Sequence, residues 1–528
     1  MKQIIFKTIK EAIKKHFENI NVDFSVTPTD IKFGDYATNV AMILAKEVGK
    51  KPQEIATIIV EELTKNDIFE KVEIAGPGFI NFKMNLSFFQ KQVADIVELK
   101  EKYGASDLGK DLKVNIEFIS ANPTGPLTLG NGRNGYFGDV LANVFKKYGA
   151  KVEREYYVND RGVQLVALGH SVLKDDEAVY KGAYIDELAP KITSTNPVEV
   201  GEQAATILME EYVKKSIAKM GIKFDEWFSE KSLHDSGEVA KALGELEKLG
   251  LIYKKEDATW LKTTDFGDDK DRVIITNKGE YTYFASDIAY HFNKIRRGYD
   301  ILIDFWGADH HGYIGRLQAA MDMYRKELNW SGELKIMICQ LVRLMSNGQE
   351  VRMSKRAGNY VLLDELIDEV GPDVTRFFFL DRTLDTHMEF DLDLAKEKSD
   401  KNPVYYVQYA YARISSILKK ADLSSQPGGP QELGSSSLLI EPTEIALIKQ
   451  LMKLPELVEE IVADYQVQKL AFYARDLATS FHHFYEKCPV IKSGSDELTA
   501  ARLQLLEATK IVLKNTLDIL GVSAPEKM

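Results

Sequence analysis

The chain has 528 residues, of which 45% are hydrophobic and 28% charged, and its formal net charge is −12. At about 150 residues per domain, this length predicts three or four domains and a large core that needs no cross-links. A count of two cysteines excludes a disulfide framework and a cysteine-rich zinc site. The acidic balance does not favour nucleic-acid binding, although a local basic surface can still provide it.

The sequence carries no targeting or membrane signal. It has no apolar run of about 18 residues, so no membrane-spanning helix is expected. The first residues after Met1 lack the long apolar stretch and the small-residue cleavage site of a signal peptide. The cysteines, Cys339 and Cys488, fit a reducing compartment if they stay unpaired. We therefore expect a cytoplasmic protein.

Residues 1–105 are expected to form a compact α/β unit. Apolar residues of helical spacing come first, and a second helix is expected over residues 36–47. A short strand over 72–74 precedes a Gly-Pro-Gly turn at 76–78, and residues 79–82 are its predicted hairpin partner.

The next segment has the pattern of a βαβ unit. Polar and apolar residues alternate over 113–118, which predicts a strand, and a loop rich in Gly and Pro follows at 121–126. Apolar residues then recur at helical spacing until Gly149, and residues 152–158 predict a second strand. The start of such a helix, directly after a strand and a glycine-containing loop, favours phosphate binding.

The remaining segments extend this unit into a multidomain α/β protein. A helical insertion is expected at about 165–255, and two further strands are predicted at 301–305 and 334–341. The simplest architecture is a Rossmann-type domain over 106–394 that is split by the insertion. Residues 395–528 are expected to form an all-helical domain.

Two motifs carry the candidate chemistry. The first is the loop that ends at the predicted helix start, where Thr128 and Asn131 share a face and can hydrogen-bond a phosphate oxygen. Gly130 and Gly132 leave room for a ligand against the backbone. From the loop alone, an ordinary N-capped helix is an equally good interpretation. The second motif is the basic, glycine-containing run 352–359, which could close over a triphosphate or could be a solvated loop.

Together, the two motifs resemble the signatures of class I aminoacyl-tRNA synthetases, His-Ile-Gly-His and Lys-Met-Ser-Lys-Ser. The sequence around the two motifs resembles that of arginyl-tRNA synthetases in particular. The segments that carry this resemblance are 121–127, 157–162, 227–230, 281–287, 402–410 and 524–528. The resemblance covers nearly the whole chain. It implies that residues 1–105 meet the tRNA elbow and that residues 395–528 bind the anticodon.

Two departures from the class pattern stand in the motifs. The first motif reads Thr128-Leu129-Gly130-Asn131, without either histidine, and the second begins with Arg352 in place of lysine. Tryptophanyl enzymes of the class often have Thr and Asn at the matching positions. The resemblance therefore implies that Thr128 and Asn131 bind phosphate in place of the two histidines. Lys355, the second lysine of the motif, is present.

The resemblance assigns residues to ATP and to catalysis. The implied catalytic residues are Thr128, Asn131, Arg352 and Lys355. The implied ATP contacts are Pro126, Leu127, Gly130, Gly132, Gly307, Asp309, Met353 and Ser354. The tandem His310-His311 beside Asp309 has no nearby Cys and no third ligand at the usual spacing, so no metal site is predicted there.

An arginine pocket needs fixed acceptors, ideally carboxylates, because a guanidinium is planar and has five donors. By the resemblance, the arginine-binding residues are Glu117, Ser120, Asn122, Tyr283 and Asp287. Each has a plain structural alternative, such as a solvent-facing strand residue at Glu117 or a helix cap at Asp287. A site built on buried hydrogen bonds rejects analogues that lack them by roughly 10⁴–10⁵-fold, so no editing domain is expected.

The implied tRNA contacts are Phe79 and Asn81 in the first domain and Tyr406, Tyr409 and Arg413 in the last. Aromatic faces beside cations suit unpaired bases, although some of these tyrosines could simply pack between helices.

The resemblance implies an arginine-tRNA ligase that uses ATP with Mg²⁺, forms an arginyl-adenylate and transfers arginine to tRNA(Arg), as a monomer without membrane contact. Two alternatives stay open on the residues: another class I synthetase, and a tRNA-binding paralogue without catalysis, which the altered first motif suggests.

Overall fold

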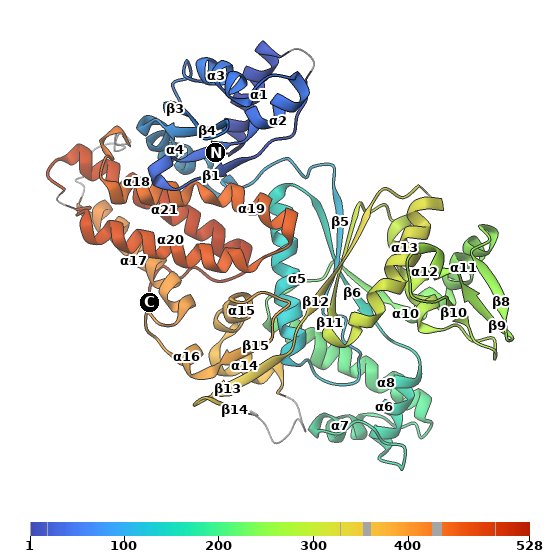
Figure 1. Ribbon diagram of the computed structural model, residues 1–528. Helices are drawn as coiled ribbons and strands as arrows, with labels where there is room; N and C mark the ends of the chain where they lie inside the picture. The colour runs from blue at the N-terminus through green and yellow to red at the C-terminus, as the bar shows by residue number, and fades with distance from the viewer. Residues whose placement is uncertain (1, 18–19, 328, 352–360, 425–435, 492) are drawn as a thin grey trace.

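The computed structural model describes residues 2–17, 20–327, 329–351, 361–424, 436–491 and 493–528. A five-stranded parallel sheet lies at its centre, with the order β12-β11-β5-β6-β7 (Figure 1). The strands are β5 (Lys113–Glu117), β6 (Lys151–Val158), β7 (Glu226–Ser229), β11 (Ile301–Gly307) and β12 (Glu333–Cys339). This order confirms the predicted Rossmann-type arrangement, in which the carboxyl ends of neighbouring strands meet at one edge.

Different helices cover the two faces of the sheet. Ile303 and Phe305 of β11 pack in the same cluster as α5 (Leu129–Tyr148), whereas Leu302 packs with α12 (Tyr283–Arg296) and α13 (Ile314–Glu327). The alternation follows from the period of two along a strand. α5 ends, as expected, at Gly149, which adopts a left-handed backbone with φ 101°.

The inserted region is not wholly helical, which corrects the sequence-based expectation. Helices α6 (Val163–Leu173), α7 (Ala183–Leu188), α8 (Pro197–Leu208) and α9 (Lys214–Lys219) come first. The chain then returns to the sheet as β7, which pairs with β6. β7 has four residues, too few for a clear alternating pattern in the sequence.

A second inserted segment, outside the central sheet, follows β7. It contains helices α10 (Glu230–Asp235) and α11 (Glu238–Lys248) and an antiparallel sheet of β8 (Ile252–Lys255), β9 (Ala258–Leu261) and β10 (Arg272–Ile275). It packs with α12 and α13 in one hydrophobic cluster, to the right of the sheet in Figure 1.

The N-terminal unit has an antiparallel sheet of order β1-β2-β4-β3. Its strands are β1 (Val26–Pro28), β2 (Tyr36–Thr38), β3 (Phe69–Ala75) and β4 (Phe79–Met84), and its helices are α1 (Lys2–His16), α2 (Val40–Val48), α3 (Pro52–Leu63) and α4 (Leu86–Leu99). The predicted hairpin is confirmed as β3 and β4. The helix expected from residue 36 was wrong at its start, because Tyr36 begins a strand between β1 and β4.

Beyond the central sheet the chain is mainly helical. A small sheet of β13 (Val342–Ser346), β14 (Gln349–Glu350) and β15 (Met388–Asp391) accompanies α14 (Leu363–Val370), α15 (Pro372–Leu380) and α16 (Leu392–Lys396). The last helices are α17 (Pro403–Ser424), α18 (Pro442–Leu451), α19 (Lys453–Asp464), α20 (Gln468–Lys487) and α21 (Asp496–Leu520). In the described part of the chain, no helix has the length and apolarity to cross a membrane.

The N-terminal unit lies against the C-terminal helices (Figure 1). α4 packs on α18 and α21, and the backbone N–H of Lys2 donates to Glu456 at 2.7 Å. One hydrophobic cluster runs from the N-terminal unit through the α5 face of the sheet into the C-terminal helices. The helical insertion α6–α8 has a cluster of its own.

Candidate active site

A large cleft of about 1960 Å³ opens at the carboxyl edge of the central sheet. Its walls come from the ends of β5, β6 and β11, from the start of α5 and from α12. The sequence-predicted residues that line it are Glu117, Ser120, Asn122, Pro126, Leu127, Thr128, Gly130, Asn131, Tyr283, Asp287, Gly307 and Asp309. Residues predicted from separate motifs are therefore brought to one cleft, at the edge where nucleotide folds bind ligands.

Thr128 and Asn131 bond to each other at the start of α5. Asn131 Oδ1 accepts hydrogen bonds from the backbone N–H and from the hydroxyl of Thr128, both at 2.9 Å. Thr128 is the N-cap residue of this helix, so the pair has a structural role as well as a place in the cleft. The unpaired N–H groups of the first helical turn give this end of the cleft a positive potential.

The two glycines of the motif differ. Gly130 lines the cleft, and a Cβ placed on it would meet only Thr128 Oγ1, at 3.8 Å. Gly132 does not line the cleft. A Cβ there would lie 2.5 Å from Leu363 Cδ1 of α14, so Gly132 allows α5 to pack closely against α14.

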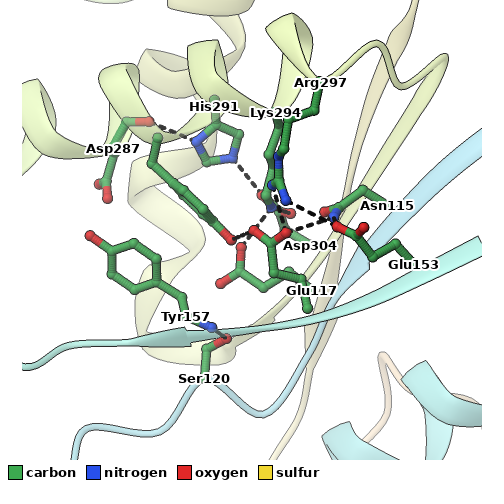
Figure 2. Close-up of polar contacts among 12 residues, drawn as sticks. Asn115, Glu117, Ser120, Glu153, Tyr157, Asp287, His291, Lys294, Arg297 and Asp304 are labelled. Carbon is green, nitrogen blue, oxygen red and sulfur yellow. Dashed lines mark hydrogen bonds and ion pairs between the residues drawn. The ribbon is translucent and has the colours of Figure 1, made fainter. Parts of the chain in front are cut away.

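The end of β5 supplies the acceptors predicted for arginine. Ser120 Oγ accepts a hydrogen bond from the backbone N–H of Tyr157 at 3.0 Å, and Asn122 Oδ1 accepts one from Asn159 Nδ2 at 2.9 Å. Glu117 is 8% exposed and is bonded through Oε2 to Lys294 Nζ at 2.7 Å (Figure 2). This burial and this bond exclude the alternative that Glu117 is a solvent-facing strand residue.

Asp287 and Tyr283 both lie on α12, one turn apart. Tyr283 is 57% exposed at the mouth of the cleft. Asp287 lies in the second turn, so it is not a helix cap, and its Oδ2 accepts a hydrogen bond from Tyr313. Burial raises the pKa of Asp287 to about 6, although the bond from Tyr313 opposes this shift.

Glu230 is a further carboxyl in the cleft that the sequence-based site did not include. It begins α10, is 5% exposed and lines the same wall as Asp287. Burial, followed by the nearby charge of Asp287, raises the pKa of Glu230 to about 7. In the sequence, Glu230 could have been found only because it belongs to the segment 227–230, which resembles the family. That segment has no residue pattern that indicates a binding site.

A row of carboxylates crosses the sheet below these residues. Asp304 of β11 is the register partner of Glu117, and Glu117 is the register partner of Glu155 on β6. Two cations lie against this row: Lys294 of α12 binds Glu117 and Asp304 (Figure 2), and Arg297, directly after α12, pairs with Glu155. Burial alone would lower the pKa of Lys294, but the charges of Asp304 and Glu117 outweigh it and raise this pKa.

The end of β11, next to β5, also lines the cleft. Gly307 is its last residue, and a Cβ on it would lie 2.5 Å from Asp309 Oδ1. Asp309 is exposed in the short 3-10 turn that follows, 3.5 Å from His310 Nε2. Among the described residues, no group of three or more His, Cys, Asp or Glu could hold a metal ion.

The second motif, with Arg352, Met353, Ser354 and Lys355, lies outside the described residues. The chain is described again from Val361, and Leu362 forms an antiparallel bridge with Thr128. The segment that follows the motif therefore lies beside the first motif.

The predicted tRNA contacts lie far from the cleft, in the terminal domains. Phe79 of β4 is 41% exposed and Asn81, two residues on, is half-buried. On α17, Tyr409 is 42% exposed, and exposed Arg413 lies over the ring of Tyr485 at 5.2 Å.

Tyr406 is placed differently from Tyr409. It is half-buried, its hydroxyl bonds to Thr479, and its ring lies 5.0 Å from that of His482. Packing between α17 and α20 accounts for much of this residue's surface, as the alternative interpretation expected.

Comparison with known proteins decides the family. Three family models match: "Arginyl tRNA synthetase N terminal domain" over residues 2–84, "tRNA synthetases class I (R), catalytic domain" over 191–378 and "DALR anticodon binding domain" over 407–528. The arginine–tRNA ligase of Citrifermentans bemidjiense is 43% identical and is matched over 96% of this chain and 95% of its own length. That of Listeria welshimeri is 44% identical over 95% and 93%.

The chain belongs to the arginyl-tRNA synthetase family. Among solved structures, the arginyl-tRNA synthetase of Thermus thermophilus superposes with a TM-score of 0.79 at 21% identity and covers all of both chains. That of Plasmodium falciparum gives 0.75 at 20% identity, over 100% of this chain and 99% of the other. These two likenesses support the fold alone, and they confirm the predicted fold class.

Proposed function

We propose that the cleft activates L-arginine with ATP and transfers the arginyl group to tRNA(Arg), as the family of arginine–tRNA ligases implies. One observation carries the assignment of the site. Buried carboxylates and a helix N-terminus line the same cleft, so a single cavity offers a cation site and an anion site.

Arginine lies with its guanidinium between Glu117 and Asp287, and Glu230 adds a third carboxyl. Carboxylates suit this group because each can accept hydrogen bonds from its planar set of five donors. Asn122 and Ser120, at the loop after β5, hold the α-amino and carboxylate end. Tyr283 closes the mouth of this part of the cleft from α12.

ATP lies across the start of α5. Thr128, Asn131 and the backbone of Pro126, Leu127 and Gly130 meet the phosphates. Gly307 and Asp309 meet the ribose, as strand ends do in nucleotide folds. The second motif supplies Arg352, Met353, Ser354 and Lys355 against the triphosphate. Mg²⁺ enters with the ATP phosphates, since this ion is usually held by substrate phosphates with few protein ligands.

The reaction has two steps. An oxygen of the arginine carboxylate bonds to the α-phosphorus of ATP, and pyrophosphate leaves. The terminal ribose hydroxyl of the tRNA then attacks the acyl carbon, loses its proton, and AMP leaves. Neither step uses a protein nucleophile, so the chain acts by positioning and by stabilising charge on the phosphates.

The terminal domains bind the tRNA. Tyr409 and Arg413, with Tyr406 behind them, offer an aromatic and cationic surface to anticodon bases, and Phe79 with Asn81 offers a smaller one to the tRNA elbow. We place the domain bounds at 1–105, 106–394 and 395–528, and we propose a cytoplasmic monomer.

Pyrophosphate exchange into ATP, measured with tRNA(Arg) present, tests the function. We expect exchange with L-arginine and none with lysine or without an amino acid. Aminoacylation of tRNA(Arg) in the same preparation checks the second step. An absence of arginine-dependent exchange would identify the chain as a tRNA-binding paralogue without catalysis.

A further inference from the structure

Lys294 is the most deeply buried cation next to the arginine pocket. Its side chain is 0% exposed, and it does not line the cleft. Nζ donates to Glu117 Oε2 at 2.7 Å and to Asp304 Oδ1 at 2.9 Å, and it lies 4.4 Å from the ring centroid of Tyr290. Two ammonium donors are thus used by carboxylates and the Tyr290 ring lies against the group, so Lys294 is held in one place.

The register of the sheet explains why a cation is required there. Asp304, Glu117 and Glu155 stand side by side on three adjacent parallel strands. Like charges directly opposite each other destabilise a sheet, and buried carboxylates need partners to stay charged. Asp304 has a second partner in His291, whose Nε2 lies 2.6 Å from Oδ2. For the Glu117 side chain, Lys294 is the only hydrogen-bond partner among the described residues.

We propose that Lys294 is a positioning residue for arginine recognition, which holds one oxygen of Glu117 so that the other faces the cleft. The inference rests on the proposed role of Glu117 as a reader of the guanidinium. No described residue hydrogen-bonds to Glu117 Oε1, while Lys294 fixes Oε2. Without Lys294, the Glu117 carboxylate would lose the bond that fixes its orientation and would turn, and the guanidinium would lose an oriented charged acceptor.

Lys294 and its neighbours also connect Glu117 and Asp287, the two residues proposed to bind the guanidinium. Asp287, His291 and Lys294 follow one another along one face of α12, and His291 Nδ1 lies 2.8 Å from the backbone oxygen of Asp287 (Figure 2). The contacts of Lys294 and His291 with Asp304 fix this face against the sheet, so the spacing of Glu117 and Asp287 depends on them.

The test compares Lys294→Met in the wild-type chain and in Glu117→Gln. We expect Lys294→Met to raise the KM for arginine about 10- to 100-fold, the range for losing a hydrogen bond to a charged group, and to change the KM for ATP by less than about twofold. In the Glu117→Gln background the same change should add less than about threefold, because the two residues act as one unit. Lys294→Arg should recover most of the arginine affinity.

Arg297→Met is the matched control. Arg297 directly follows the last residue of α12 and pairs with Glu155 of the same row of carboxylates, and neither residue lines the cleft. A purely structural role for Lys294 predicts that both variants lower the melting temperature and change the two KM values alike. We expect Arg297→Met to leave the KM for arginine within about twofold.

Three results would overturn the inference. They are an unchanged KM for arginine in folded Lys294→Met, an equal effect of Lys294→Met with and without Glu117, and a matching rise in Arg297→Met. If Lys294→Met is unfolded at the assay temperature, Lys294→Gln carries the same comparison in both backgrounds. An unaltered KM for arginine in Glu117→Gln would instead remove Glu117 from the pocket, and the inference with it.

Discussion

At the residue scale, the cleft combines carboxyls whose protonation differs from that of exposed side chains. The pKa of Asp287 is about 6 and that of Glu230 about 7, mainly because both are buried. Each carboxyl binds a guanidinium well only when it is ionised. In the proposed pocket, protons and arginine therefore compete for these carboxyls between pH 5 and 8.

We expect the KM for arginine to rise as the pH falls from 8 to 5.5. The rise should begin near pH 7, where Glu230 becomes protonated, and should become steeper below about pH 6, where Asp287 becomes protonated as well. Aminoacylation at saturating ATP and tRNA measures it. Asp287→Asn should have a high KM that changes less with pH in this range. A KM in the wild-type chain that stays constant from pH 8 to 5.5 would contradict the pocket assignment.

Thr128 and Asn131 combine helix capping with the proposed phosphate contact. Thr128→Ala and Asn131→Ala should each lower kcat/KM about ten- to hundredfold, from the loss of roughly 1–3 kcal/mol of hydrogen bonding in the transition state. Asn131→Ala should also lower the free energy of unfolding by about 1 kcal/mol, because it removes the acceptor for Thr128.

Asn131→Asp separates the two roles. The carboxylate can still accept both bonds from Thr128 and suits a helix N-terminus, so stability should be kept. Its charge should repel the phosphates and lower kcat/KM further than Asn131→Ala does. Near-normal activity in Asn131→Asp would mean that the side chain does not meet phosphate.

The sequence predicted the residues of the cleft better than their connections. Thr128 belongs to a local pattern, a helix start after a glycine-containing loop, whereas Glu117 and Asp287 were assigned by the family resemblance. Lys294 and Glu230 were not predicted, because their contacts with Glu117 and Asp287 join segments far apart in the sequence, and no local pattern reports such a contact. Gly132 shows another limit, because its close packing against Leu363 of α14 could not be predicted from the glycine-containing loop.

At the element scale, α6 and α8 of the insertion cross with their backbones in contact. A Cβ on Gly169 would lie 1.8 Å from the backbone oxygen of Pro197, and one on Gly201 would lie 1.9 Å from that of Leu165. Neither backbone atom can move aside alone. The two glycines are therefore required for this crossing.

We expect Gly201→Ala to destabilise the insertion by about 1–3 kcal/mol or more, since it overpacks a fixed contact. Activity should also fall, because Tyr184 of α7 donates to the Thr124 carbonyl in the phosphate loop at 2.9 Å. Limited proteolysis within residues 163–219 and kcat measure the two effects. Gly244→Ala in α11 is the control: a Cβ there meets nothing within 4 Å, so stability should rise by about 0.5–1 kcal/mol. Equal behaviour of the two variants would contradict the argument.

Element type was predicted well where segments are long and periodic, and poorly where they are short. The pattern of α5 and its end at Gly149 were predicted because apolar residues repeat one spacing from Phe137 to Tyr148. β2 and β7 have three and four residues, and pairing with neighbours distant in sequence defines them. Tertiary contacts override local preference in such segments.

At the scale of the whole molecule, Arg376 joins three regions. Its guanidinium, 2% exposed, binds Asp139 of α5 at 2.7 Å, the Leu520 carbonyl at the end of α21 at 3.1 Å and the Met220 carbonyl after α9 at 2.8 Å. Central sheet, C-terminal helices and insertion meet at this one side chain.

Arg376→Met should lower the free energy of unfolding by about 3 kcal/mol, the lower end of the range for breaking a buried ion pair, because Asp139 keeps its bond to Arg154. Denaturant unfolding should broaden or divide into two steps as the C-terminal helices separate from the sheet. Arg475→Met, which breaks a partly exposed pair with Asp381, should cost less than about 1 kcal/mol. An equal decrease in the free energy of unfolding in both variants would show that Arg376 contributes no more to stability than a partly exposed ion pair.

The acidic row across the central sheet also has a consequence for synthesis on the ribosome. β5 and β6, with Glu117 and Glu155, are made long before α12, and Lys294 follows Glu117 by 177 residues. Until those residues emerge, the two strands bring carboxylates together without the cations that neutralise them. The first half of the sheet should therefore stay open during translation, and it should close in one late, cooperative step when α12 arrives.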